Sequence, residues 1–172
     1  MAQTYTLAAT AVTMANNKSL IAVFNDTGSG RIVRLYRAWI LNNQHIAIAG
    51  SITMLELRRI TTRSAGVTIT PLKHNSSSEN FPSQVTAATN STVTTSDLFI
   101  RAGFSTDEPA SATLSIDEIQ LMPALNVIWD VGYNDSNIEP IVCREGQGVS
   151  LQNVGATTGQ VDVFFEITLA NS

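Results

Sequence analysis

The clearest pattern in the chain is the alternation of apolar and polar residues near its C-terminus. In residues 161–169 every odd position is apolar, and most even positions are polar. A period of two places alternate side chains on opposite faces of a β-strand, so this segment predicts a strand with one buried face. Phe164 breaks the pattern, because it is an aromatic residue on the polar face. Its presence there indicates that something covers the outer face, and a partner subunit is the first candidate.

Two shorter strands are expected just before this one. Val149 and Leu151 form a second alternating run, and a glycine-containing loop after Asn153 links it to the last strand. Since glycine supplies turn conformations at little steric cost, we expect these two strands to pair as a hairpin. Residues 141–145 predict a third strand, and the Gly-Gln-Gly at 146–148 that follows it is typical of a corner or bulge.

Similar runs recur through the rest of the chain, separated by turn residues. Residues 31–41 are apolar on both faces, with Arg34 and Arg37 interleaved, so both sides of this strand are expected to be covered. The polar tract 73–95 contains Phe81 and other apolar residues, which predicts an ordered excursion instead of a linker.

About ten short strands and no convincing helix emerge from this pattern, which is typical of a sandwich or barrel. We therefore predict an all-β fold, namely a single-domain, jelly-roll-like sandwich of about eight to ten antiparallel strands. Residues 1–17 are expected to form an N-terminal arm or first strand, and residues 18–172 the sandwich domain.

Composition and charge narrow the class of protein. The chain has 172 residues, enough for one domain with a substantial core, and only 14% of them are charged. A net charge of -4 offers no electrostatic attraction to nucleic acid. Residues 1–17 lack the basic start and apolar block of a signal peptide, and no apolar run approaches the length of a membrane span. We expect a soluble protein, made in a cytoplasm, that binds neither nucleic acid nor membrane.

Residues suited to catalysis are few and scattered. The two histidines, His45 and His74, have no paired spacing, so a transition-metal site is not expected. The glycines at 28–30 and 146–148 are interpreted as turn formers, because they connect strands and not a strand to a helix. The single cysteine, Cys143, is interpreted as a buried apolar residue. We therefore expect no enzyme and no cofactor.

The sequence leaves two kinds of ligand as alternatives, a calcium ion and a carbohydrate. Oxygen ligands for Ca²⁺ are available from Asp130, Asp135 and Glu139. The segment nevertheless lacks the acids at alternate positions that a calcium loop carries. Flat rings that could bind a carbohydrate are available from Trp39, Trp129 and Tyr133. Tryptophan in an alternating strand is, however, more often part of the core.

Glu56, Arg58 and Arg59 lie among the apolar residues of one predicted strand. They can be solvated residues of an exposed face, or they can form ion pairs across a subunit contact. We favour the solvated interpretation, since exposed pairs are common and contribute little stability.

Several segments resemble head decoration, or cement, proteins of tailed bacteriophages. The resemblance lies in MLELRRIT, ITPLKHN, FPSQVTAAT, FSTDEPA and above all LNVIWDVGYNDSNIEPIVCREGQGVSLQN, and it spans about residues 31–169. It implies a β-sandwich subunit that trimerises and binds an icosahedral shell where major capsid proteins meet. Residues 1–17 lie outside the resemblance and are a candidate for an arm that reaches the shell.

The leading hypothesis is therefore a structural virion protein on the capsid surface, a homotrimer that binds the major capsid protein. The alternative is a tail- or fibre-type module that recognises a receptor or a cell-surface glycan. An enzyme on a cupin-like jelly roll is disfavoured by the small number of histidines. The candidate residues for a subunit or capsid interface are Arg34, Arg37, Arg58, Arg59, Phe81 and Phe164.

Overall fold

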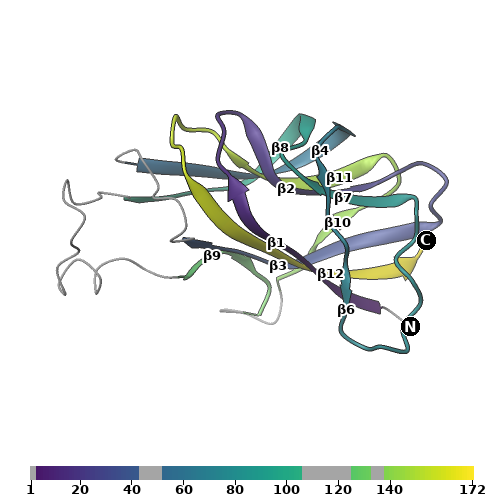
Figure 1. The fold of residues 1–172 in the computed structure, drawn as a ribbon. Helices are drawn as coiled ribbons and strands as arrows, with labels where there is room; N and C mark the ends of the chain where they lie inside the picture. Colours follow the sequence, from purple (N-terminus) through teal and green to yellow (C-terminus); the bar gives the residue numbers. More distant parts are fainter. Residues whose placement is uncertain (1–2, 43–51, 106–124, 133–137) are drawn as a thin grey trace.

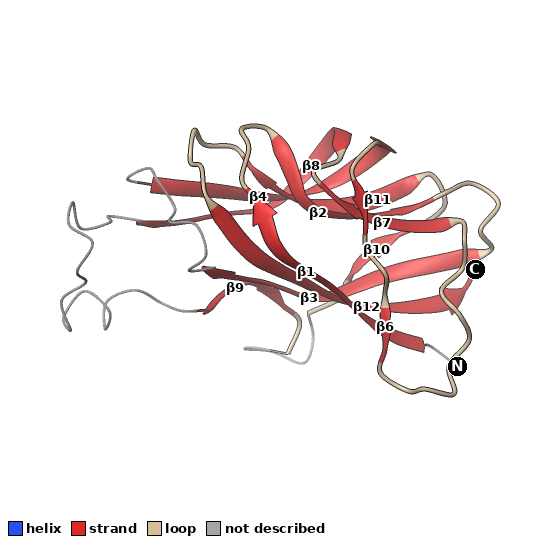
Figure 2. Cartoon of the chain, viewed as in Figure 1, coloured by secondary structure: helices blue, strands red, loops and turns tan. Residues whose placement is uncertain are grey.

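The computed structural model describes residues 3–42, 52–105, 125–132 and 138–172. Within these ranges the chain is all-β, and two antiparallel six-stranded sheets pack face to face as a sandwich (Figures 1 and 2). The predicted all-β sandwich is confirmed. In the described part of the chain, no helix has the length and hydropathy that crossing a membrane requires.

The first sheet, here called sheet A, contains both ends of the described chain. In spatial order its strands are β10 (Ile141–Cys143), β3 (Arg31–Asn42), β12 (Gln160–Asn171), β1 (Gln3–Thr13) and β6 (Leu72–Lys73). The sixth strand, β9 (Leu125–Asp130), pairs with β3 on the same side as β10, but farther along it. One edge of sheet A is thus shared by β9 and β10, and the other consists of β1 with the short β6 (Figure 1).

The second sheet, sheet B, covers the inner face of sheet A. In spatial order its strands are β5 (Val67–Thr68), β7 (Val85–Thr89), β2 (Lys18–Asn25), β11 (Gln147–Asn153), β4 (Ile52–Ser64) and β8 (Thr92–Ser105). The core between the two sheets is built from inward side chains of both, including Leu7, Leu35, Phe165, Leu57 and Leu151, all fully buried.

The N-terminal segment is a full member of sheet A. β1 pairs with β12 along most of its length, and its Tyr5 and Leu7 are fully buried in the core. Of the two interpretations of residues 1–17, the structure therefore has a strand, and residues 3–13 do not form a free arm.

The predicted hairpin between the last two strands is wrong. β11 lies in sheet B between β2 and β4, whereas β12 lies in sheet A between β3 and β1. The chain after Asn153 therefore crosses from one sheet to the other. Both strands face the same core from opposite sides, so each has an apolar face, and alternation cannot distinguish neighbours within a sheet from strands that face each other.

β4 and β8 form a long ribbon that is bent. Its register shifts three times, at Leu57/Arg58, Arg58/Ile60 and Ile60/Thr62. Such irregularities bend and twist a pair of strands. Ile60 and Val93 of this ribbon pack with Ala22 and Phe24 of β2 in a second, smaller cluster, which is separate from the main core.

Candidate interaction surface

The outer face of sheet A carries a row of apolar side chains. Phe164 of β12 lies opposite Trp39 of β3 on one side and Ala8 of β1 on the other. Its ring stacks on the indole of Trp39, with centroids 5.8 Å apart and planes 21° apart. Val127 of β9 follows Trp39 in the same row. Cross-strand aromatic pairs of this kind stabilise a sheet, but here the pair lies on the face that points away from the core.

Two further leucines extend this row towards one end of the sheet. Leu41 of β3 lies opposite Leu125 of β9, one pleat away from the Trp39–Val127 pair. Leu125 and Val127 are 51% and 50% exposed. We refer to Ala8, Trp39, Leu41, Leu125, Val127 and Phe164 together as the outer patch. Apolar side chains gathered on one exposed face are typical of surfaces that bind another protein.

A charged row borders the outer patch. The guanidinium of Arg37 donates to Asp130 at 3.2 Å and to Glu166 at 3.0 Å. The hydrogen bond to Asp130, followed by the charge of Glu166, raises the pKa of Arg37. His74 hydrogen-bonds through Nε2 with Thr6 at 2.8 Å, and its Nδ1 lies 3.9 Å from Glu166. Because opposite charges are paired within the chain, this row can be covered by a partner without leaving Arg37 unpaired.

Three of the predicted interface residues lie on this face. Phe164 belongs to the outer patch, Arg37 to the charged row, and Arg34 lies between Thr168 and Val142 on the same side of β3. Strand β3 was predicted to be covered on both sides. Within the described part of the chain it is covered on its inner side, where, for example, Val33 and Leu35 are buried. On the outer side the described side chains of β3 are at most partly buried.

Arg58 lies on the opposite side of the molecule, on the outer face of sheet B. Glu56 beside it accepts hydrogen bonds from Arg58 and from Arg101, and the Glu56 side chain is only 5% exposed. The expectation of a solvated Glu56 is therefore wrong, because the two arginines cover it within the same chain. Their hydrogen bonds, that of Arg58 first, hold the pKa of Glu56 below its usual range despite burial.

Arg59 is turned towards the interior between the two sheets. Its guanidinium donates to the carbonyl of Val142 in sheet A at 2.8 Å, and lies 5.1 Å from the ring centroid of Phe99. A third contact, to Asp97, measures 3.1 Å. This orientation continues the alternation of β4, in which the odd-numbered Leu55 and Leu57 are buried in the main core.

Phe81 packs on the chain itself. Its ring meets that of Tyr5 edge-on, with centroids 5.1 Å apart and planes at 82°. The Tyr5 hydroxyl donates to the carbonyl of Glu79 at 2.9 Å, which ties the loop before β7 to β1. The predicted ordered excursion is therefore present, and Phe81 attaches it to the main core.

The two tryptophans have opposite orientations. Trp129 lies opposite the buried Ala38 and packs against the main core, whereas Trp39 is on the outer face. Of the candidate carbohydrate-binding rings, only Trp39 therefore combines a described position with an outward face. Tyr133 lies outside the described residues.

The residues considered for metal binding do not gather in the described parts of the chain, where no group of three His, Cys, Asp or Glu side chains is close enough to hold an ion. Asp130 instead accepts hydrogen bonds from Arg37 and from the amide of Gly132. His45 and Asp135 lie outside the described residues. Cys143 is fully buried, and burial raises its pKa to about 11, as expected for an apolar cysteine.

The glycines of the loop between β2 and β3 serve the chain itself. Gly28 and Gly30 both have positive φ, and their amides donate to the carboxylate of Glu145 at 3.0 and 2.7 Å. These two hydrogen bonds lower the pKa of Glu145. The interpretation of these glycines as turn formers agrees with this geometry.

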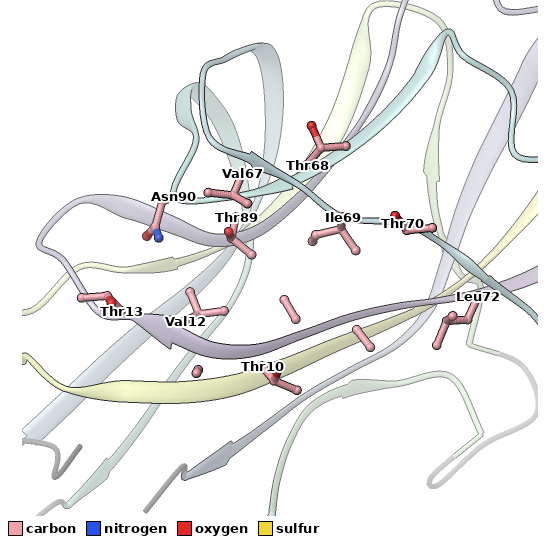
Figure 3. Close-up of a pocket in the computed structure, with 13 residues that line it drawn as sticks. Thr10, Val12, Thr13, Val67, Thr68, Ile69, Thr70, Leu72, Thr89 and Asn90 are labelled. Atoms are coloured by element: carbon pink, nitrogen blue, oxygen red, sulfur yellow. The ribbon is translucent and has the colours of Figure 1, made fainter. Parts of the chain in front are cut away.

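An open hollow lies beside the free part of β1. Its volume is about 460 Å³, and it is bounded by residues 8–13 on one side and by residues in 67–72 with Thr89 and Asn90 on the other. Figure 3 shows Val12 on one of these segments and Ile69 on the other, with the hollow between them. None of the described residues that line it is charged. The sequence carried no signal for this hollow, because it depends on how the edges of the two sheets are placed.

Comparisons with protein-family models, with curated proteins and with solved structures find no match for this chain.

Proposed function

We propose that this chain is a structural virion protein that decorates an icosahedral phage capsid as a homotrimer and stabilises the shell. The observation that carries the proposal is the outer patch, in which Trp39 and Phe164 stack on a sheet face that no described strand of the chain covers. Apolar side chains gathered on an outer sheet face are typical of a surface that binds another protein, which supports a partner at this face.

The connectivity supports a jelly-roll-like subunit. The central strands of sheet A run in the order β1-β12-β3-β10, and those of sheet B in the order β2-β11-β4-β8. From β1 to β4 each successive strand changes sheet, and the same is true from β10 to β12. Interleaved strands of this kind are characteristic of the double-sheet jelly roll.

The mechanism is stabilisation by mass action. A protein that binds the assembled shell better than the free capsid subunits lowers the free energy of the assembled state. Three linked subunits attach at three points, so modest affinity at each point gives firm attachment overall. In this role the chain has no catalytic step, and its partners are other copies of itself and the major capsid protein.

The test uses phage particles assembled without this protein, to which purified protein is added back. We expect added wild-type protein to raise the temperature at which the shells release DNA. Phe164→Glu places a charge in the outer patch and should abolish this protection, whereas the control Leu98→Glu changes a side chain that is 44% exposed on sheet B and should retain it. Equal survival of shells with and without the wild-type protein would refute the proposal.

A receptor-binding module of tail or fibre type is the second candidate, and the outward indole of Trp39 favours it. Aromatic faces at a surface can stack on sugar rings. This function predicts binding on a glycan array that is lost in Trp39→Ala and kept in Leu98→Ala. A glycan array without any bound sugar would argue against it.

A further inference from the structure

One edge of sheet A lacks a strand partner over part of its length. β6 pairs with β1 only at Tyr5 and Thr6, and beyond them no strand of the described chain pairs with residues 8–13 on that side. The amide of His74 donates to the carbonyl of Thr4, so Thr4, Thr6 and Ala8 direct their backbone groups towards this edge, up to the register shift between Ala9 and Val12. Unpaired backbone groups of this kind are a template for another strand.

At the opposite edge of sheet A, β9 lies level with this unpaired stretch of β1. Ala8 lies in one row with Phe164, Trp39 and Val127, so the free part of β1 is level with β9. Farther along the sheet, β10 pairs with β3 at one edge, roughly level with the place where β6 pairs with β1 at the other edge. The two edges are therefore complementary, because β9 projects where the other edge is open.

Strand direction and chemistry fit the same pairing. β9, β3, β12 and β1 alternate in direction, so β9 of a second copy with the same orientation would run antiparallel to β1. β9 has six residues, as many as the open stretch 8–13, in which β1 has a register shift between Ala9 and Val12. Residues 125–129 carry no charge, and neither does the hollow beside β1. An uncharged strand can enter there without desolvating an ion.

We propose that β9 of one copy pairs with the free edge of β1 in the next copy, so that sheet A continues from copy to copy around a three-fold axis parallel to the strands. The inference rests on the homotrimer of the proposed function and identifies the surfaces that join its subunits. The contact is head-to-tail, because β9 and β1 are different surfaces, and such a contact forms a closed ring when the rotation from copy to copy closes.

The width of the sheet accounts for the number three. At this height sheet A has four strands, β9, β3, β12 and β1, which span about 19 Å at roughly 4.8 Å per strand. Three such sheets arranged as a triangle lie about 5.5 Å from their common axis, close to half of the roughly 10 Å that separates packed sheets. With the outer faces turned inward, the three outer patches meet at the axis and are buried. Four copies would leave the sheets about 10 Å from the axis, too far for the patches to fill the centre.

The experiment combines the native mass with disulfide cross-linking of paired cysteines. A rotation about an axis parallel to the strands does not shift a residue along the strand direction. Because Ala8 and Val127 are level within one copy, Ala8 then lies opposite Val127 of the next copy. We expect the purified wild-type protein to have the mass of a trimer. The double variant Ala8→Cys with Val127→Cys should give covalent dimers and trimers under oxidation. Each single variant, and the mismatched pair Ala8→Cys with Leu98→Cys, should give none. Cys143 does not interfere, because it is fully buried.

Each outcome decides a separate question. A trimeric mass with cross-linking only in the matched pair supports the edge pairing. A trimeric mass without that cross-link, or with equal cross-linking of the mismatched pair, overturns the edge pairing but leaves the homotrimer standing. A covalent dimer from Ala8→Cys alone indicates like-with-like contact and also overturns it. A monomer at every concentration overturns both this inference and the homotrimer.

A measurement on the unmodified protein guards against variants that fail to fold. In the trimer the amide of Ala8 is predicted to be hydrogen-bonded to the neighbouring β9, so its hydrogen exchange should slow as the protein concentration rises and trimers form. Fast exchange at Ala8, at a concentration where the mass is that of a trimer, would overturn the edge pairing without any substitution.

Discussion

Replacing Gly148 by alanine tests how closely β11 is enclosed by its neighbours. A methyl group added at Gly148 would meet the carbonyl oxygen of Val23 well inside 3.0 Å, and the Ile60 Cγ1 and Phe24 Cα atoms at 2.9 Å. Two of these three atoms belong to the backbone of β2, which is paired on both sides and cannot easily move. The third belongs to Ile60, where the bent ribbon of β4 and β8 packs in the smaller cluster.

Two opposing effects set the magnitude. Alanine restricts the unfolded chain and by itself would stabilise the protein by about 0.4–1 kcal/mol. Overpacking costs typically about 1–3 kcal/mol, and more where the surroundings are rigid. Because backbone atoms are in the way, we expect overpacking to dominate, with a net loss of about 2–3 kcal/mol. For a chain of this size that loss lowers Tm by roughly 4–12 °C.

The assay is urea unfolding and thermal melting at one protein concentration. Gly103→Ala is the matched control, since its added methyl group would meet only the carbonyl oxygen of Thr53, at 3.3 Å. We expect the control to stay within about 1 kcal/mol of the wild type. A Gly148→Ala protein as stable as the wild type would refute the proposed crowding between β2, β11 and β4.

Three further predictions concern single side chains. Cys143 should resist a thiol reagent at pH 8 in the native protein and react fully in denaturant, since burial raises its pKa to about 11; rapid native labelling would contradict its burial. Glu56→Gln should lower the free energy of unfolding at pH 7 by about 2 kcal/mol, because the hydrogen bonds from Arg58 and Arg101 lose their charged acceptor. The folded-state pKa of Glu56 is lowered, so its contribution to the free energy of unfolding is present above the unfolded pKa and is lost as pH falls through the folded pKa. In unfolding curves, the difference in stability between wild type and Glu56→Gln should therefore close below about pH 4. A difference that does not depend on pH would contradict the ion pair. Phe164→Glu should shift the native mass towards the monomer while the far-UV circular dichroism stays unchanged, and a persistent trimer would exclude the outer patch from the subunit contact.

Particular residues show which features of the fold were open to prediction. The odd positions of residues 161–169 are buried as the alternation predicted, and Phe164 lies on the outer face as its position in the pattern required. The burial of Cys143 followed from its place in a predicted strand. These features depend on the period of two of a single strand, which neighbouring residues alone determine.

The partners of each strand were not open to prediction in the same way. Residues 147–153 and 160–171 are close in sequence, but they belong to different sheets. Glu56 and Arg101 are 45 residues apart, and only the pairing of β4 with β8 brings them together. Arg59 faces inward as the alternation of its strand requires, but only the packing of the two sheets brings the carbonyl of Val142 within its reach.

By itself the sequence determined the class of fold, the faces of its clearest strands and the presence of an aromatic residue on a polar face, because strand periodicity is a local property. Only the tertiary structure decided that Trp39 stacks on Phe164 and that Val127 lies in the same row. It also decided that, among the described strands, one edge of sheet A is open where the other carries β9. These features depend on which strands are neighbours and in what register. Register is decided by the packing of the whole chain, since each of the long strands in the core offers an apolar face that several partners could cover.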